Sequence, residues 1–240
     1  KLEVSNQELQ DFASVAAHDL QEPLRKVQSF SDRVKLKAQG SIPPEALDYL
    51  NRVQASAARM QVLINDLLTY SRVTTKAKPF TALSLDQVMN HVCSDLEARL
   101  EQTQGKINFS NLPVIQADPV QMHQLFLNLL SNGLKFHKPL IAPLISISAE
   151  IIQKVPGFFG PVCQIQVKDN GIGFDEKYLD RIFTIFQRLH GRHEYEGTGI
   201  GLAVCRKIVD RHGGLLTAKS QVGEGANFII TLPINQLEGQ

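Results

Sequence analysis

Apolar residues recur at every seventh position in the first third of the chain, on both sides of a break at residues 40–44. The series before the break are Leu9, Ala16, Pro23, Phe30 and Ala13, Leu20, Val27, Val34. The series after it are Leu50, Ala57, Ile64 and Val53, Met60, Leu67. This spacing puts the apolar side chains on one face of a helix, so it predicts a long helix from Leu9 to about Lys37 and a second one after the break.

Two such helices form a hairpin, and a hairpin alone leaves each apolar seam only half covered. A second copy would complete a four-helix bundle. The sequence therefore predicts a homodimer through residues 1–72. The polar stretch beyond residue 72 ends at Pro79 and predicts a linker over residues 73–79.

Beyond the linker the pattern changes to short apolar or alternating runs separated by helical patterns. The runs that predict strands are Phe80–Leu85, Lys106–Phe109, Val114–Ala117, Leu144–Ile152, Val162–Val167, Leu215–Lys219 and Asn227–Leu232. The patterns that predict helices are Asp86–Gln104, Val120–Phe136 and Gly201–His212. We therefore expect a multidomain chain, α followed by α/β, with residues 80–240 forming a sheet that carries helices on one face.

Composition narrows the class of protein without selecting a function. The 240 residues are 43% hydrophobic, which suffices for a globular core. Lys plus Arg is 25 against 24 for Asp plus Glu, so no nucleic-acid partner is expected. Three separated cysteines without a C-x-x-C pair argue against a disulfide framework or a zinc ribbon.

No targeting or membrane-spanning segment stands out, and we expect this portion to be cytoplasmic, in a parent protein that is either soluble or membrane-anchored. No apolar run approaches the roughly 20 residues that span a bilayer. The chain opens at Lys1 without a charged and then apolar leader. We therefore expect an excised piece whose upstream sensor region is missing.

His18 is the first candidate for chemistry. It stands two positions after Ala16, on the side of the predicted helix that faces away from the seam, so we expect it in water. A solvated histidine without a role is the plain alternative. Asp19 comes directly after it and would hold the imidazole in the tautomer that leaves one nitrogen nucleophilic.

A second group lies on the helix predicted over 120–136. Asn128, Asn132 and Lys135 are spaced four and three apart and share one helical face. An amide oxygen suits Mg²⁺, and a lysine offers charge to phosphate. The alternative is an amphipathic helix that shows its wet face.

Two glycine-rich segments lie further along the chain. Asp169-Asn-Gly171-Ile-Gly173 ends a predicted strand with a turn that lets backbone approach a ligand, and an Asp there would accept a hydrogen bond from an adenine amine. The run at 197–202 leads into a helix, whose first N–H groups bind phosphate. It matches neither a P-loop nor a dinucleotide fingerprint.

Together these motifs resemble, in order, the catalytic core of sensor histidine kinases of two-component signalling. The matching segments are His18–Leu24 (H box), Asn128–Phe136 (N box), Asp169–Phe174 (G1 box), Phe183–Phe186 (F box), Gly197–Leu202 (G2 box) and Gly223–Phe228 (last glycine motif). The H box, with Gln-Glu-Pro-Leu-Arg at residues 21–25, is similar to that of phytochrome-type kinases. This hints at a light-sensing or PAS-type region upstream.

The resemblance implies a fold, a reaction and a set of roles. The fold is a dimeric helical hairpin followed by the GHKL/Bergerat-type α/β sandwich of DNA gyrase and related ATPases. The reaction is autophosphorylation of His18 by ATP, with Asp19 as orienting base, followed by transfer to an aspartate of a response-regulator receiver domain. The implied ATP and Mg²⁺ residues are Asn128, Asn132 (Mg²⁺, with Asn128 as a second ligand candidate), Lys135, Asp169, Gly171, Gly173, Gly197, Thr198, Gly199, Gly201 and Leu202.

Some positions depart from the family pattern. Gly133 replaces the usual Ala, His137 replaces Thr or Ser, and Glu22 replaces the Thr or Asn of phosphatase-active relatives. The implied ATP lid, residues 187–196, holds a set of side chains that offers a metal site as an alternative to a solvated lid: His190, His193, Glu194 and Glu196. Lid arginines 188 and 192 are candidates for the γ-phosphate.

Two other functions stay open at this point. One is an ATP-driven conformational machine, which the phase of the H box within the seam argues against. The other is a nucleotide-binding dimerisation module without catalysis, which the intact Asn132, Asp169 and glycine motifs argue against. The sequence leaves the signal, the response regulator, and the choice between cis and trans phosphorylation undefined.

Overall fold

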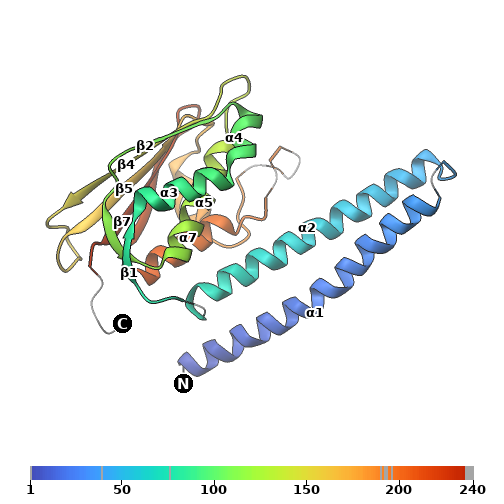
Figure 1. Cartoon of the computed structure of the whole chain (residues 1–240), viewed down its shortest axis with the longest axis horizontal. Coiled ribbons are helices and arrows are strands. Elements are labelled where there is room, and N and C mark those ends of the chain that lie inside the picture. Colours follow the sequence, from blue (N-terminus) through green and yellow to red (C-terminus); the bar gives the residue numbers. More distant parts are fainter. Residues whose placement is uncertain are drawn as a thin grey trace. The chain divides into compact units, whose positions relative to one another are not determined.

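The computed structural model describes residues 2–38, 40–75, 77–189, 191, 194–195 and 197–235; the side chains of residues 2–16 and of His18 lie outside this description. The chain forms two compact units, residues 1–75 and 76–240. Figure 1 shows a helical hairpin in the first unit and a sheet with helices in the second. The predicted order of an α part followed by an α/β part is confirmed.

The first unit consists of α1, Leu2–Lys37, and α2, Pro44–Thr75. Polar pairs join the two helices along their length: Gln21 Nε2 donates to Asn65 Oδ1 at 2.8 Å, and Lys35 Nζ donates to Asn51 Oδ1 at 2.6 Å. Helix α2 continues three residues past the expected end at Arg72, so the first part of the expected linker is helical.

On α1, the described part of the predicted apolar seam, from Leu20 onward, does not pack against α2. The side chains of α1 that are buried are Ala17, Leu24 and Ser31, which are also seven apart. The seam residues Leu20, Val27 and Phe30 are 55%, 39% and 61% exposed. A second apolar face is therefore open on the hairpin, and α2 adds the half-exposed Val53, Met60 and Leu67.

The second unit is built around a five-stranded sheet of order β2-β4-β5-β7-β6 within the described residues. Its strands are β2 (Lys106–Phe109), β4 (Leu144–Ile152), β5 (Val162–Asp169), β6 (Leu215–Gln221) and β7 (Gly225–Pro233). Strand β2 pairs parallel with β4, and all other neighbours are antiparallel. Two further strands, β1 (Thr81–Ser84) and β3 (Val114–Ala117), form a separate antiparallel pair.

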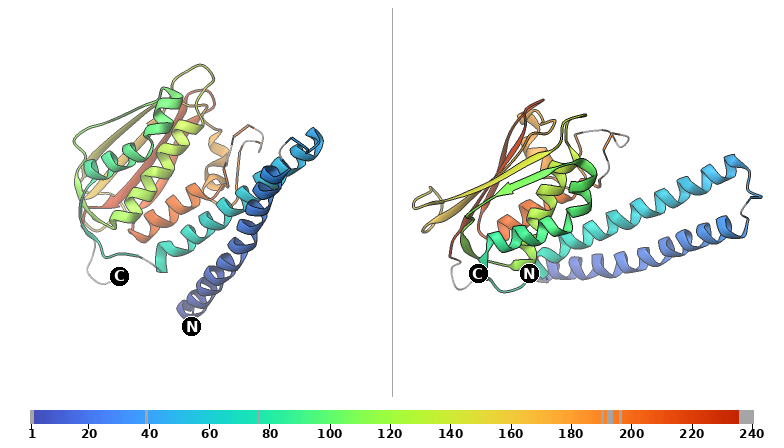
Figure 2. Two further views of the ribbon diagram at one scale, coloured as in Figure 1. Left: turned by 45° about the vertical axis from the view of Figure 1, so that its right-hand side comes forward. Right: turned by 45° about the horizontal axis from the view of Figure 1, so that its top comes forward.

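Three main helices cover one face of this sheet (Figure 2). They are α3 (Leu85–Asp95), α5 (Pro119–Lys135) and α7 (Gly201–Arg211), accompanied by the short α4 (Glu97–Thr103) and α6 (Leu179–Ile182) and a 3₁₀ turn at Glu176–Tyr178. Alternation along the strands explains the arrangement, because Ile145, Ile165 and Ile230 are fully buried beneath the helices. The opposite face carries polar side chains, among them Asn227, whose Nδ2 donates to Gln166 Oε1 at 3.0 Å.

The prediction of one helix over residues 86–104 is wrong, because the structure has two helices there. Leu96 interrupts it with φ −96° and ψ 2°, so α3 ends at Asp95 and α4 begins at Glu97. The N–H of Leu96 is shared between the carbonyls of Val92 and Cys93, and the side chain of Leu96 is buried. The change of direction therefore adds Leu96 to the core.

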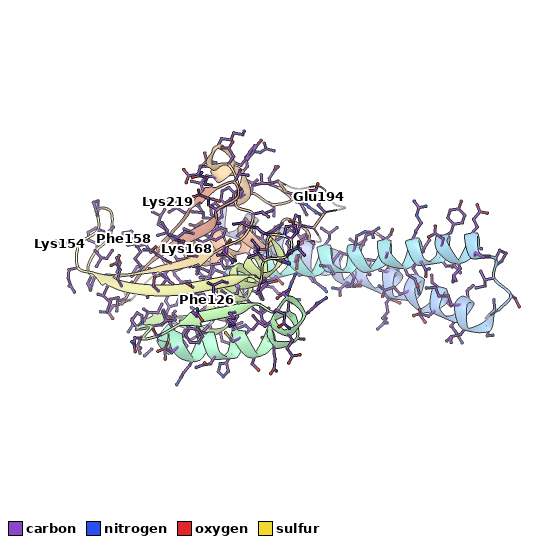
Figure 3. The ribbon with its side chains drawn as sticks, turned by 90° about the horizontal axis from the view of Figure 1, so that it is seen from above. Phe126, Lys154, Phe158, Lys168, Glu194 and Lys219 are labelled. Carbon is purple, nitrogen blue, oxygen red and sulfur yellow. The ribbon has the colours of Figure 1, made fainter. Side chains whose placement is uncertain are left out.

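The second unit has two opposite ends, which Figure 3 marks by labelled side chains. Glu194, in the segment after α6, lies at one end, and Lys154 and Phe158 of the β4–β5 hairpin lie at the other. Phe126 of α5 is fully buried among the core side chains. None of the helices among the described residues has a stretch both long and apolar enough to cross a membrane.

Candidate functional site

Helix α5 carries the first set of candidate side chains. Asp118 caps its N-terminus, and its apolar positions, including Met122, Leu125 and Phe126, are fully buried under the sheet. Asn128, Asn132 and Lys135 share the half-buried face, as their spacing predicts.

Asn128 ties α5 to the start of α7. Its Nδ2 donates to the carbonyl of Gly201 at 3.2 Å, and its Oδ1 accepts from Gln124 Nε2 at 3.1 Å. Both ends of this amide are therefore engaged by protein. Asn132, one turn further along, makes no side-chain hydrogen bond within the described part of the chain, so its amide is the one available to a ligand.

Lys135 brings the end of α5 to the glycine run that precedes α7. A Cβ added to Gly197 would lie 3.0 Å from Lys135 Nζ, and a Cβ on Gly201 would lie 3.7 Å from the Asn128 amide carbon. The ammonium also lies 4.0 Å from the centroid of the Phe136 ring. The structure thus brings together two motifs that are more than sixty residues apart in sequence.

Asp169 ends β5 on the helix-covered face of the sheet. Its Oδ1 accepts hydrogen bonds from Gly171 N at 2.8 Å and from Ala226 N at 3.1 Å. Burial raises the pKa of this carboxyl, while the two N–H donors and the nearby Lys138 act in the opposite direction. Among the described residues no donor reaches Oδ2, so one carboxylate oxygen remains for a ligand.

The glycines around Asp169 are required by close backbone approach. A Cβ on Gly171 would meet the carbonyl oxygen of Phe136 at 2.4 Å, and one on Gly173, at φ +62°, would meet that of Gln221 at 2.1 Å. Gly225 approaches the Asp169 carbonyl equally closely. The turn at residues 170–173 therefore packs closely against the end of α5 on one side and the β6–β7 turn on the other.

The run from Gly197 to Leu202 leads into the N-terminus of α7. Gly199 has φ +77°, and its carbonyl accepts from Phe186 N at 3.0 Å. Thr198 Oγ1 accepts from Ile200 N at 3.4 Å. No side chain caps α7, unlike α3 and α5, so its first N–H groups remain for an anion.

Arg188 forms hydrogen bonds with main-chain carbonyls. Its guanidinium donates to the carbonyls of Gly197 at 2.6 Å, Tyr195 at 2.5 Å and Gly191 at 3.3 Å. It thus organises the segment between α6 and α7. His190, Arg192, His193 and Glu196 lie outside the described residues, and with them most of the alternative metal set.

The candidate phosphoacceptor is only partly described. His18 lies within α1, but its side chain is outside the description; Asp19 is exposed. The described residues hold no group of three or more His, Cys, Asp or Glu side chains that would coordinate a metal ion.

Sequence reasoning missed several contributors. Ala226 supports Asp169 through its N–H, which no side-chain pattern reveals. Gln124, one turn before Asn128, carried a signal, since it extends the polar face of α5. Tyr195 packs its ring 4.9 Å from that of Phe136 and had no motif to mark it.

Two family models match the chain. Residues 8–76 match the His Kinase A (phospho-acceptor) domain, and residues 117–236 match the histidine kinase-, DNA gyrase B- and HSP90-like ATPase domain.

Similar proteins include phytochromes of cyanobacteria. Cyanobacterial phytochrome A of Nostoc sp. is 40% identical over 99% of this chain, and phytochrome-like protein Cph1 of Synechocystis sp. is 37% identical over 97%. The chain spans 30% of the length of each relative. A crystal structure of full-length ShkA in complex with AMPPNP matches with a TM-score of 0.68 at 22% identity, covering 95% of this chain and 47% of that one, which shows a shared fold.

Proposed function

Because the chain belongs to the sensor histidine kinase family, we propose that it transfers the γ-phosphoryl group of ATP to His18 and then to an aspartate of a response-regulator receiver domain. The observation that carries this proposal is the convergence of Lys135 and Asn128 with the glycine run before α7, next to the anchored carboxylate of Asp169. This arrangement offers a base acceptor at one end and phosphate donors at the other.

ATP lies, in this proposal, between α5 and the two glycine segments. Oδ2 of Asp169 accepts from the adenine amine, and Gly171 and Gly173 form the wall beside the base. The phosphates meet the N–H groups at the start of α7, where Gly197, Thr198, Gly199, Gly201 and Leu202 leave the backbone accessible. Lys135 supplies positive charge to the phosphates.

The donor set fits Mg²⁺. The unengaged amide of Asn132 provides a hard oxygen, and Mg²⁺ commonly takes one or two protein oxygens and completes its shell with phosphate and water. Asn128 is a weaker candidate because Gln124 already donates to its oxygen. Bound Mg²⁺ supplies neutralisation of phosphate charge.

In the first step the γ-phosphoryl group moves from an oxygen of ATP to a ring nitrogen of His18. A neutral imidazole nitrogen of His18 attacks the γ-phosphorus, the bond to the β–γ bridging oxygen breaks, and ADP leaves with that electron pair. The other ring nitrogen then releases its proton, which the carboxylate of Asp19 accepts. Most of the rate comes from positioning and charge neutralisation.

We propose that residues 1–72 form a homodimer, with residues 73–79 as linker and residues 80–240 as the ATP-binding domain. The support is the open apolar face of α1 and α2, which includes Leu20, Phe30 and Met60, each at least 46% exposed. A second hairpin would cover this face and complete a four-helix bundle.

Receiver docking is proposed at the polar side of the hairpin near the phosphoacceptor. An open groove there is lined by Gln21, Glu22, Arg25, Gln28 and Gln61. We further propose that this portion is cytoplasmic and that a phytochrome-like sensor region precedes it, since the phytochrome relatives are more than three times as long.

The test is incubation with Mg²⁺ and γ-labelled ATP. We expect label that is acid-labile and base-stable in the wild type and absent from His18→Gln and Asn132→Ala. The matched control His91→Gln removes an exposed histidine of α3 and should keep full labelling. An unlabelled wild type that still binds ATP would refute the kinase assignment for this chain. ATP turnover that persists in His18→Gln would favour the conformational machine.

A further inference from the structure

A buried polar cluster lies at the end of the second unit away from the proposed nucleotide site. Asp118, 1% exposed, is its centre. Oδ1 caps α5 by accepting from Val120 N at 3.0 Å and Gln121 N at 3.3 Å. Oδ2 accepts from Lys78 N at 2.7 Å and from Arg211 Nη1 at 3.2 Å. One carboxylate thus joins the start of α5, the end of α7 and the chain that enters the unit.

Arg211 binds the other main-chain group of Lys78, its carbonyl. Its Nη2 donates to the carbonyl of Lys78 at 2.9 Å, and its Nη1 also donates to Gln121 Oε1 at 2.9 Å. The guanidinium lies 4.6 Å from the centroid of the Phe80 ring, which packs 4.7 Å from the ring of His212. Figure 1 shows the chain reaching β1 beside this end of α7.

The two hydrogen bonds to Lys78 are not required to hold α5 and α7 together. Arg211 already joins α7 to α5 through Gln121, and His212 Nε2 joins them again by accepting from Asp118 N at 3.1 Å. The two bonds to Lys78 use only its main chain, and its exposed side chain takes no part. Directional bonds to both main-chain groups of one residue fix its position and orientation more sharply than apolar contact does.

We propose that Asp118 and Arg211 are positioning residues for the phosphoryl transfer: they clamp the interdomain linker at Lys78, so that reorientation of the ATP-binding domain occurs only upstream of that residue. The inference rests on the proposed function. Helix α5 runs about 25 Å from this clamp to the nucleotide site, and α7 runs about 16 Å. Lys78, both helices and the bound nucleotide therefore move as one body.

The clamp sets the length of chain that connects α2 to the first fixed residue of the second unit. Helix α2 ends at Thr75, so two residues, 76 and 77, separate it from Lys78. Complete release of the clamp would add residues 78–80, up to the start of β1 at Thr81, and the connection would lengthen from two to five residues. Effective concentration falls roughly as the −3/2 power of linker length, which gives about a fourfold loss.

The experiment compares variants of the whole chain in single-turnover labelling at saturating ATP. Arg211→Gln removes the grip on the Lys78 carbonyl, and Arg211→Lys keeps the charge but cannot reach both partners. Lys78→Ala is the matched control, because it leaves both main-chain groups intact. We expect slower labelling in both Arg211 variants, by up to about fourfold, and wild-type labelling in the control. ATP affinity should stay within about twofold in all, since the nucleotide site is remote from the clamp.

Hydrogen exchange supplies a second readout. The Lys78 amide, bonded to a buried carboxylate, should exchange slowly in the wild type and faster in the Arg211 variants. Unchanged labelling in folded Arg211 variants, or a loss of ATP affinity equal to the loss in rate, would overturn the proposal. If Arg211→Gln does not fold, Arg211→Lys decides alone. A wild type that is never labelled refutes the proposed kinase function instead, so the two failures are distinct.

Discussion

Replacement of Asp169 by Asn should remove the hydrogen bond to adenine and keep the hydrogen bonds that hold the turn after β5. The amide oxygen of Asn retains the hydrogen bonds from Gly171 N and Ala226 N that Oδ1 accepts now. The amide nitrogen takes the place of Oδ2 and presents N–H groups to the adenine amine, which is also a donor. The perturbation therefore acts on the ligand and leaves the local fold in place.

The expected magnitude comes from that single lost interaction. A hydrogen bond to a charged acceptor contributes about 1.5–3 kcal/mol, so ATP should bind roughly 10- to 150-fold more weakly to Asp169→Asn. The thermal midpoint should stay level or rise, because the variant removes an ionised group that burial disfavours. Asp169→Ala should lower it, because both N–H groups lose their partner at about 1–3 kcal/mol each.

Calorimetric titration with ATP and inosine triphosphate provides the assay. Hypoxanthine presents an oxygen where adenine has its amine, so Asp169→Asn should shift preference toward inosine triphosphate. Asp175→Asn is the matched control, since Asn also caps the turn at Lys177. Wild-type ATP affinity should fall on acidification at a higher pH than an ordinary carboxyl would give, because the pKa is raised. Wild-type preference and affinity in Asp169→Asn would refute the assignment.

Three further outcomes are expected. Gly173→Ala should abolish ATP binding with partial loss of stability, because its Cβ would lie 2.1 Å from the Gln221 carbonyl oxygen at φ +62°; retained binding in calorimetry would contradict this. His212 is fully buried, and burial is the main cause that lowers its pKa. Below about pH 6.5 this histidine is therefore protonated in the unfolded chain but still neutral in the folded chain. Urea unfolding should therefore show stability falling below about pH 6.5 by up to about 1.4 kcal/mol per pH unit, and His212→Gln should flatten this dependence. Phe30→Lys places charge on the open face and should shift the protein toward monomer in sedimentation, whereas the exposed Tyr49→Lys should not; equal behaviour of the two would argue against that interface.

The strands can be predicted from the sequence almost completely, because alternation is a local signal. The runs Lys106–Phe109, Val114–Ala117 and Leu144–Ile152 appear at their predicted bounds. The break at Leu96 cannot be predicted, since no Gly or Pro marks it and only burial of that side chain in the folded core explains it.

The candidate site, too, can be predicted from the sequence only in part. Motif spacing predicts that Asn128, Asn132 and Lys135 share a face, and the glycine pattern predicts close backbone approach at Gly171. The partners of these groups lie far away in sequence, and pattern reasoning cannot supply them. The seam on α1 shows a third case: its period is correct, but whether it meets α2 or a second copy depends on tertiary packing around Ala17.

The dependence of Asp169 on Ala226 has a consequence for biosynthesis. Strand β5 pairs with β4, its neighbour in sequence, but also with β7 at the far end of the domain. A ribosome that has released β5 has not yet made the amide that fixes the Asp169 carboxylate, and contacts of such long sequence separation form late. The proposed affinity for ATP is therefore expected to arise only after β7 has emerged, so that premature termination before β7 yields a chain without the proposed nucleotide site.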